Sequence, residues 1–140
     1  EDGMGAETFR LFRESYAKDA PRTKTRFHAL VGKGDAKQSE VIRGLEHHND
    51  VENTARWLPW LDTLGLNDAT TEPLAKTPTT LIIHGMNDQI VPHAQGEFLA
   101  RYLPKATLSS WAEVGRAPSC TCGARMMAEI HAHRRRHGVA

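Results

Sequence analysis

Cysteine and aromatic residues are scarce in this chain of 140 residues, and it has no long apolar runs. Two cysteines, Cys120 and Cys122, are too few for a disulfide framework, which agrees with a reducing compartment. Apolar runs such as 81–83 are far shorter than the roughly 20 residues that a membrane-spanning helix needs. No charged and then apolar leader opens the sequence, so we expect a cytoplasmic protein that does not enter a membrane.

Positive and negative charges nearly balance, at 18 Lys and Arg against 17 Asp and Glu, but they are unevenly distributed. Between Arg10 and His48 the basic residues outnumber the acidic ones by nine to five, whereas residues 50–72 hold five acids and one Arg. Such asymmetry bears on partners and association rather than on fold. The basic stretch faces an acidic partner or is a solvated helical surface, and the sequence leaves both interpretations open.

The first part of the chain has the apolar spacing of helices. Phe9, Phe12 and Tyr16 recur at intervals of three and four, which places them on one helix face. We expect four helices, over about residues 7–18, 21–31, 37–47 and 53–64. Pro59 predicts a kink or a boundary in the last of them. Four short helices with narrow apolar faces are typical of a lid, so we assign residues 1–68 to a helical lid region.

The second part changes to alternating strands and helices. We expect strands over 79–84 and 106–111, and helices over 92–103 and 125–137. The first strand is short, apolar and β-branched, which predicts burial on both faces, and Phe98 and Leu99 are expected to face inward. Strand, helix, strand and helix in this order indicate a parallel sheet. The fold class is therefore α/β, and we assign residues 69–140 to the C-terminal part of its core.

By its position, we expect segment 78–92 to bear chemistry, and it reads Pro-Thr-Thr-Leu-Ile-Ile-His-Gly-Met-Asn-Asp-Gln-Ile-Val-Pro. Functional groups gather at the carboxyl ends of parallel strands, and Asp88 stands three residues after Gly85 at such an end. Strand, Gly-x-x-Asp, turn and Val-Pro in this order resemble the acid-bearing segment of the α/β-hydrolases. The resemblance implies a partial α/β-hydrolase fold with Asp88 as the acid of a catalytic triad. A structural Asp that caps the helix from Pro92 is the alternative.

The other two triad members are missing from the positions that the resemblance implies. In α/β-hydrolases a Ser within Gly-x-Ser-x-Gly precedes the acid and a His follows it. That Ser motif does not occur in this sequence, so we expect only the later half of the fold. Residues 115–118, Gly-Arg-Ala-Pro, resemble the His-bearing turn but hold Arg116 at the His position. Guanidinium stays protonated and cannot act as a general base, so we expect an inactive chain in which Arg116 pairs with Asp88.

Two stretches in the first part, 22–30 and 34–38, resemble the lid of the pimeloyl-[acyl-carrier protein] methyl ester esterases, serine carboxylesterases of biotin synthesis. In that family, lid arginines meet the acidic helix and phosphopantetheine of acyl carrier protein, and a lid Phe lines the acyl channel. By resemblance, the carrier-binding residues are Arg22, Arg26, Lys37 and Arg43, and the substrate-binding residue is Phe27. Arg22 and Arg26 are four residues apart and share a helix face, which suits phosphate and carboxylate contacts. The alternatives are ordinary surface charge for the basic residues and lid packing for Phe27.

The resemblance implies a carboxylic ester hydrolase that acts on an acyl-carrier-protein thioester substrate without a metal or an organic cofactor. Two alternatives remain for this chain. It is either a non-catalytic module that binds an acidic carrier protein or a truncated, inactive gene product.

Three other clusters carry weaker signals. Cys120 and Cys122 lack the spacing and the second pair of a zinc site, and His133 and His137 have no clear third ligand. The arginines at 134–136 are explained by a charged terminal helix. We therefore expect neither a metal site nor nucleic-acid binding.

Overall fold

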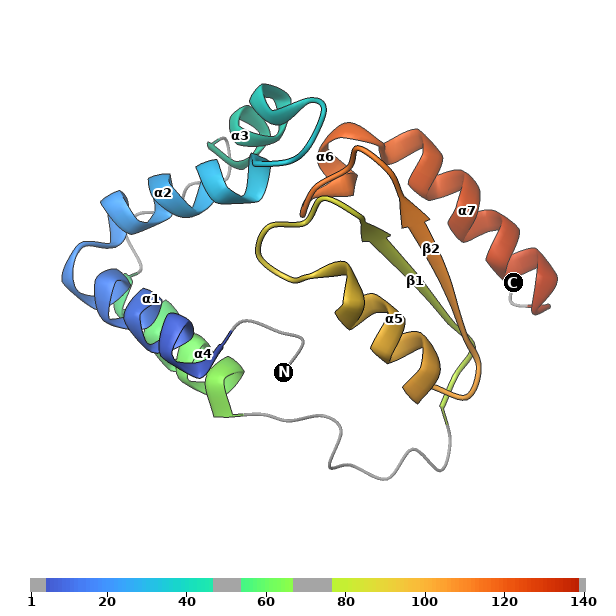
Figure 1. The fold of residues 1–140 in the computed structure, drawn as a ribbon, viewed down its shortest axis with the longest axis horizontal. Helices are drawn as coiled ribbons and strands as arrows, with labels where there is room; N and C mark the ends of the chain where they lie inside the picture. The colour runs from blue at the N-terminus through green and yellow to red at the C-terminus, as the bar shows by residue number, and fades with distance from the viewer. Residues whose placement is uncertain (1–4, 47–53, 67–76, 139–140) are drawn as a thin grey trace.

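The computed structural model describes residues 5–46, 54–66 and 77–138 of the chain (Figure 1). Four helices come first: α1 (Ala6–Lys18), α2 (Ala20–Gly32), α3 (Gln38–Glu46) and α4 (Thr54–Leu66). Two strands and three helices follow: β1 (Thr80–Gly85), α5 (His93–Tyr102), β2 (Ala106–Trp111), α6 (Pro118–Thr121) and α7 (Gly123–Arg136). The predicted order of elements is confirmed, and α6 is the one element that we did not predict. The boundary expected at 68 and 69 lies outside the described residues.

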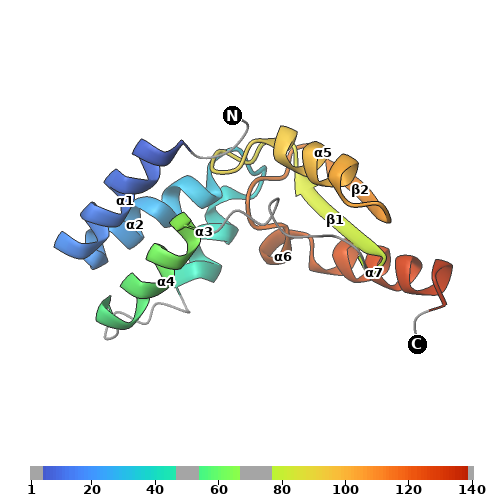
Figure 2. The same ribbon diagram turned by 90° about the horizontal axis from the view of Figure 1, so that it is seen from below.

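The strands β1 and β2 form a parallel pair in register from Thr80 opposite Ala106 to Gly85 opposite Trp111. Helix α5 connects them. It covers one face of the pair, and α7 lies along the opposite face (Figure 2). This is the α/β layering that the alternation of strand and helix predicted. Both strands end at the same edge, so the loops that follow Gly85 and Trp111 lie side by side.

The expectation that the first strand is buried on both faces was wrong. The residues from Thr80 to His84 are only half-buried, and Gly85 alone is buried. Within the described ranges the sheet has two strands, so each strand has a neighbour on one edge only. Leu99 of α5 is also exposed rather than inward-facing, and Gly96 is the buried residue of this helix.

The four N-terminal helices pack in pairs, α1 with α2, α1 with α4, and α2 with α3. The Phe12 ring of α1 meets the Phe27 ring of α2 at 5.3 Å between centroids, and Tyr16 is buried. Helix α4 runs through Pro59 without a boundary, contrary to one of the two alternatives expected there. Its Trp60 is mostly exposed, and the main packing partner of α4 among the described elements is α1.

The helices α1 to α4 are called the lid below, after the expectation from the sequence. Two of them, α2 and α3, share a hydrophobic cluster with the loop after β1. Val31 of α2, Val41 of α3 and Ile90 of the loop are all buried. Four half-buried residues pack around them: Phe27, Leu45, Val91 and Ala117. The lid therefore packs directly on the loops that leave the sheet. Among the described helices, none is long and apolar enough to span a membrane.

Candidate active site

The two loops that leave the sheet are joined by backbone hydrogen bonds. The amide of Met86 donates to the carbonyl of Trp111 over 2.9 Å, and that of Asn87 donates to the carbonyl of Val114 over 3.0 Å. A Cβ atom at Gly85 would lie 2.2 Å from the carbonyl oxygen of Gly115, so only glycine allows this close approach. The sequence thus brings residue 88 beside residue 116 by ending β1 with glycine.

Asp88 is fixed by its own loop. Its Oδ1 accepts hydrogen bonds from the backbone amides of Ile90, at 2.8 Å, and Val91, at 3.0 Å. Its side chain is 3% exposed. These bonds close a turn within the loop and do not cap the following helix, because α5 begins after Pro92 without a side-chain cap. The helix-capping alternative was therefore wrong, and the turn uses only one carboxylate oxygen. The other oxygen, Oδ2, faces position 116.

The structure brings Asp88 and Arg116 together as the sequence predicted. Arg116 Nη1 lies 3.4 Å from Asp88 Oδ2, a long contact between a buried carboxylate and a guanidinium side chain that is 43% exposed. The side chain at position 116 is thus directed toward the carboxylate of Asp88. A guanidinium cannot accept a proton at neutral pH, so Arg116 can pair with the carboxylate but cannot act as a general base.

Sequence reasoning missed Asp35, which joins the lid to the turn that carries Arg116. Asp35 is 8% exposed and lies between α2 and α3. Its carboxylate accepts hydrogen bonds from the backbone amides of Lys37 and Gly115. The only signal in the sequence was the turn composition of Gly34 and Asp35 before a helix, which does not reveal a partner 80 residues away.

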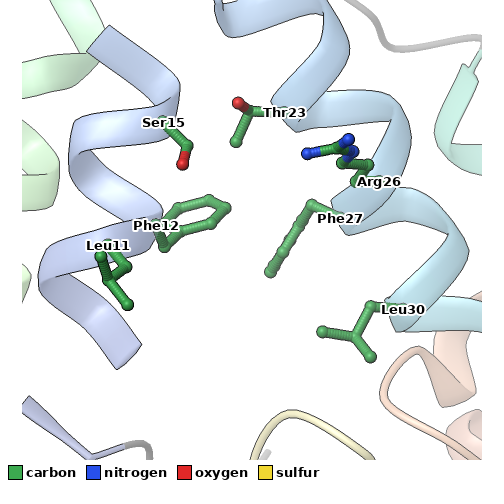
Figure 3. A pocket seen from close by; sticks show the side chains of 7 residues that line it. All are labelled: Leu11, Phe12, Ser15, Thr23, Arg26, Phe27 and Leu30. Carbon is green, nitrogen blue, oxygen red and sulfur yellow. The ribbon is translucent and has the colours of Figure 1, made fainter. Parts of the chain in front are cut away.

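An apolar cavity of about 230 Å³ lies between α1 and α2 (Figure 3). Figure 3 shows the rings of Phe12 and Phe27 facing each other across it, with Arg26 on the α2 side. Its lining residues are Leu11, Phe12, Ser15, Thr23, Arg26, Phe27 and Leu30. Phe27 therefore lines a cavity and also packs on the cluster that contains Ile90, two residues after Asp88.

The basic residues expected to bind a carrier protein lie on the lid surface. Arg22 and Arg26 are exposed on α2, Arg43 is exposed on α3, and Lys37 stands just before α3. Lys37 Nζ lies 3.7 Å from Glu40, an exposed ion pair of small energetic weight. These positions leave the basic groups accessible to an acidic partner, and their role in binding stays a prediction.

His93 and Ser110 form a second polar contact near the sheet. His93 Nε2 lies 2.7 Å from Ser110 Oγ, and its Nδ1 lies 3.6 Å from Glu97. The second distance is too long for a hydrogen bond, so the carboxylate does not fix the imidazole as a triad acid would. We assign this contact to the docking of α5 on β2.

The described residues contain no group of three or more His, Cys, Asp or Glu side chains that could hold a metal ion. The rings of His133 and His137 lie 4.5 Å apart between centroids on α7, and both ring nitrogens of His133 are buried without a partner. Cys120 and Cys122 are free thiols.

The chain is similar to esterases in sequence. It is 30% identical over 119 residues to the pimeloyl-[acyl-carrier protein] methyl ester esterase of Nitrosomonas europaea, a match that covers 83% of this chain and 47% of the relative. It is 34% identical over 126 residues to the enzyme of the same description from Aromatoleum aromaticum, with coverages of 83% and 48%. No protein-family model matches the chain. The chain thus spans about half the length of the curated relatives that it matches.

The likeness extends to a solved structure. An esterase from Exiguobacterium antarcticum superposes with a TM-score of 0.81 at 16% identity, over 94% of this chain and 48% of that one. At this identity the match shows the fold alone. The expected fold class is confirmed: the chain has a partial α/β-hydrolase fold with a small parallel sheet.

Proposed function

We propose that this chain is the lid and the acid and base loops of a serine carboxylesterase of the pimeloyl-[acyl-carrier protein] methyl ester type. The observation that carries the proposal is the contact between buried Asp88 and residue 116 at the carboxyl edge of the sheet. Relatives that are 30–34% identical and bear the name of that esterase support the choice of substrate class.

Each residue has a role in the proposed reaction. A serine from the part of the fold that this chain does not cover would attack the ester carbonyl. A histidine at position 116 would take the serine proton and pass it to the leaving methanol, while Asp88 would orient the imidazole and stabilise its charged form. Because the chain holds Arg116 there, we propose that it is inactive as it stands, with Arg116 paired to Asp88 in place of the imidazolium.

The lid cavity supports an acyl substrate. Two aromatic rings and two leucines give an apolar lining that suits an alkyl chain, and Phe27 connects this lining to the loop of Asp88 through the cluster around Ile90. Arg26 supplies the positive charge that a carboxylate or phosphate would need. We propose Phe27 as an acyl-binding residue on this ground.

A chimera tests the proposal. The chain replaces the matching segment of the Nitrosomonas europaea esterase, and methanol release from a pimeloyl methyl ester is measured. We expect only the background rate of hydrolysis with Arg116. Arg116→His should raise the rate at least about a hundredfold above that background, the usual contribution of a positioned general base. Arg101→His, which adds an imidazole on the exposed side of α5, is the matched control and should leave the chimera inactive. Activity of the Arg116 chimera would overturn the proposed inactivity, and an inactive, folded Arg116→His chimera would overturn the assigned site.

A second candidate function is binding of an acidic carrier protein without catalysis, which the exposed basic residues on α2 and α3 favour. Binding of acyl carrier protein to the unmodified chain is measured by calorimetry at low and high salt. We expect affinity at low salt that falls as salt screens the charges, and a loss in Arg22→Ala/Arg26→Ala. Arg134→Ala/Arg135→Ala removes the same charge from α7 and should bind normally. Equal losses in both double variants would contradict a lid site.

A further inference from the structure

We propose that Asp35 is a positioning residue that sets the distance between position 116 and Asp88. The role of Asp35 in catalysis rests on the proposed function, whereas its hydrogen bonds and the test below do not depend on that function. The carboxylate of Asp35 accepts hydrogen bonds from both the lid and the turn that carries Arg116. Oδ1 accepts from the amide of Lys37 in the lid at 2.8 Å, and Oδ2 accepts from the amide of Gly115 at 3.0 Å, directly before residue 116.

Three further contacts join the lid turn at 34–36 to the loop after β1, to the turn at 113–116 and to α6. The amide of Ala36 donates to the carbonyl of Glu113 over 2.9 Å, and Asn87 Nδ2 donates to the carbonyl of Gly34 over 3.0 Å. Thr121 Oγ1 lies 3.5 Å from Asp35 Oδ2. The lid turn between α2 and α3 is thus bonded to the loops on both sides of the candidate site, and Asp35 is the charged and buried member of this set.

The turn at 113–116, which Asp35 contacts through Gly115, has a strained backbone that its surroundings must stabilise. Glu113 has a φ of 59°, a left-handed conformation that costs a non-glycine residue energy and persists when its surroundings enforce it. Val114 and Gly115 are buried, whereas Arg116 is exposed. Without the bond to Gly115, the turn is free to relax and to carry residue 116 away from Asp88.

The test places a titratable reporter at position 116. Arg116→His adds a ninth histidine to the chain, so its imidazole signals are identified by their absence from the spectrum of the parent protein. A nearby Asp88 carboxylate raises the pKa of this imidazole above its ordinary value of about 6.5. If Asp35 positions the turn, Asp35→Asn in this background lowers the pKa, because the imidazole loses its proximity to Asp88.

A double-mutant cycle separates positioning from the direct effect of the Asp35 charge. The same Asp35→Asn change is made with Asp88→Asn present. A positioning role predicts a larger pKa decrease with Asp88 than without it, whereas a purely electrostatic role predicts equal decreases. Asp19→Asn is the matched control, since Asp19 also accepts a backbone amide at the start of a lid helix but is exposed and does not contact the turn. Equal decreases in both backgrounds, or none, would overturn the proposal.

A measurement on the unmodified chain covers the case in which the Asp35 variants do not fold. The amide protons of Lys37 and Gly115 are bonded to one carboxylate, so they should shift together with a single midpoint when that carboxylate is titrated. Separate midpoints, or no shift of either amide over the acidic range in which the chain stays folded, would contradict the bridging geometry.

Discussion

At the scale of single residues, the two carboxylate oxygens of Asp88 have different partners. Oδ1 is occupied by the amides of Ile90 and Val91, and Oδ2 is left for position 116. The loop itself therefore orients the second oxygen, and it does so whatever residue stands at 116. The position of the Asp88 carboxylate is thus set by its own loop and not by the residue at 116.

Removal of the Asp88 carboxylate should destabilise the fold as well as the site. Asp88→Ala leaves the buried amide of Ile90 without an acceptor, which costs about 1–3 kcal/mol, whereas Asp88→Asn keeps one oxygen for it. Urea denaturation should therefore give a clearly lower free energy of unfolding for the alanine variant than for the asparagine variant. Equal stabilities would mean that the bond to Ile90 contributes nothing.

At the scale of elements, α1 and α4 are held together by an ion pair. Arg13 donates two hydrogen bonds to Asp62, at 2.6 and 3.0 Å, and this guanidinium lowers the pKa of Asp62 below its ordinary value. A carboxyl whose pKa is lowered by folding stabilises the fold above its unfolded pKa, about 3.9, and loses that contribution as the pH falls through its folded pKa.

The pH dependence of this ion pair gives a measurable prediction. Asp62→Asn should lower the melting temperature at pH 7, and the difference from the parent should shrink as the pH falls below the ordinary carboxyl range and through the lowered pKa of Asp62. Glu7→Gln is the control, because Glu7 also has a lowered pKa but pairs with Arg10 within α1. Thermal melts followed by circular dichroism measure both. A difference that persists in acid would point to packing rather than charge.

The turn between α2 and α3 depends on a glycine. Gly34 has a φ of +89°, and a Cβ there would lie 2.4 Å from the carbonyl oxygen of Asn87. Gly34→Ala should therefore destabilise the chain by at least about 1–2 kcal/mol, the usual cost of a left-handed conformation for an L-residue. Gly123→Ala is the matched control, since nothing lies within 4 Å of its added methyl group at the start of α7. Chemical denaturation of the two variants checks the contrast.

The elements themselves follow from local patterns, and the contacts between them do not. The strand over 106–111 was predicted at its observed bounds, because its β-branched and apolar residues lie between clear breaks. Helix α6 has four residues and no apolar period, so no pattern could reveal it. Asp88 beside Arg116 was predictable from the order of motifs. The bond from Asp35 to Gly115 was not, because it depends on how the lid packs on the sheet.

At the scale of the whole molecule, the described sheet is small for its fold. Its two strands pair with each other, and several large apolar side chains are exposed, including Trp60 at 61% and Leu64 at 69%. Unpaired strand edges and apolar patches promote association. Sedimentation of the isolated chain should therefore show oligomers that increase with concentration, and fusion to the half of a relative that this chain does not match should reduce them. A monomer at all concentrations would contradict this prediction.

The cluster of Val31, Val41 and Ile90 means that the N-terminal helices are not a detachable accessory. A shortened version that begins after α4 would present Ile90 to water and remove the apolar support beneath the segment of Asp88. In such a product the Asp88 carboxylate would lose its position together with the helices. Any engineered version of one half of this chain must therefore include the other half.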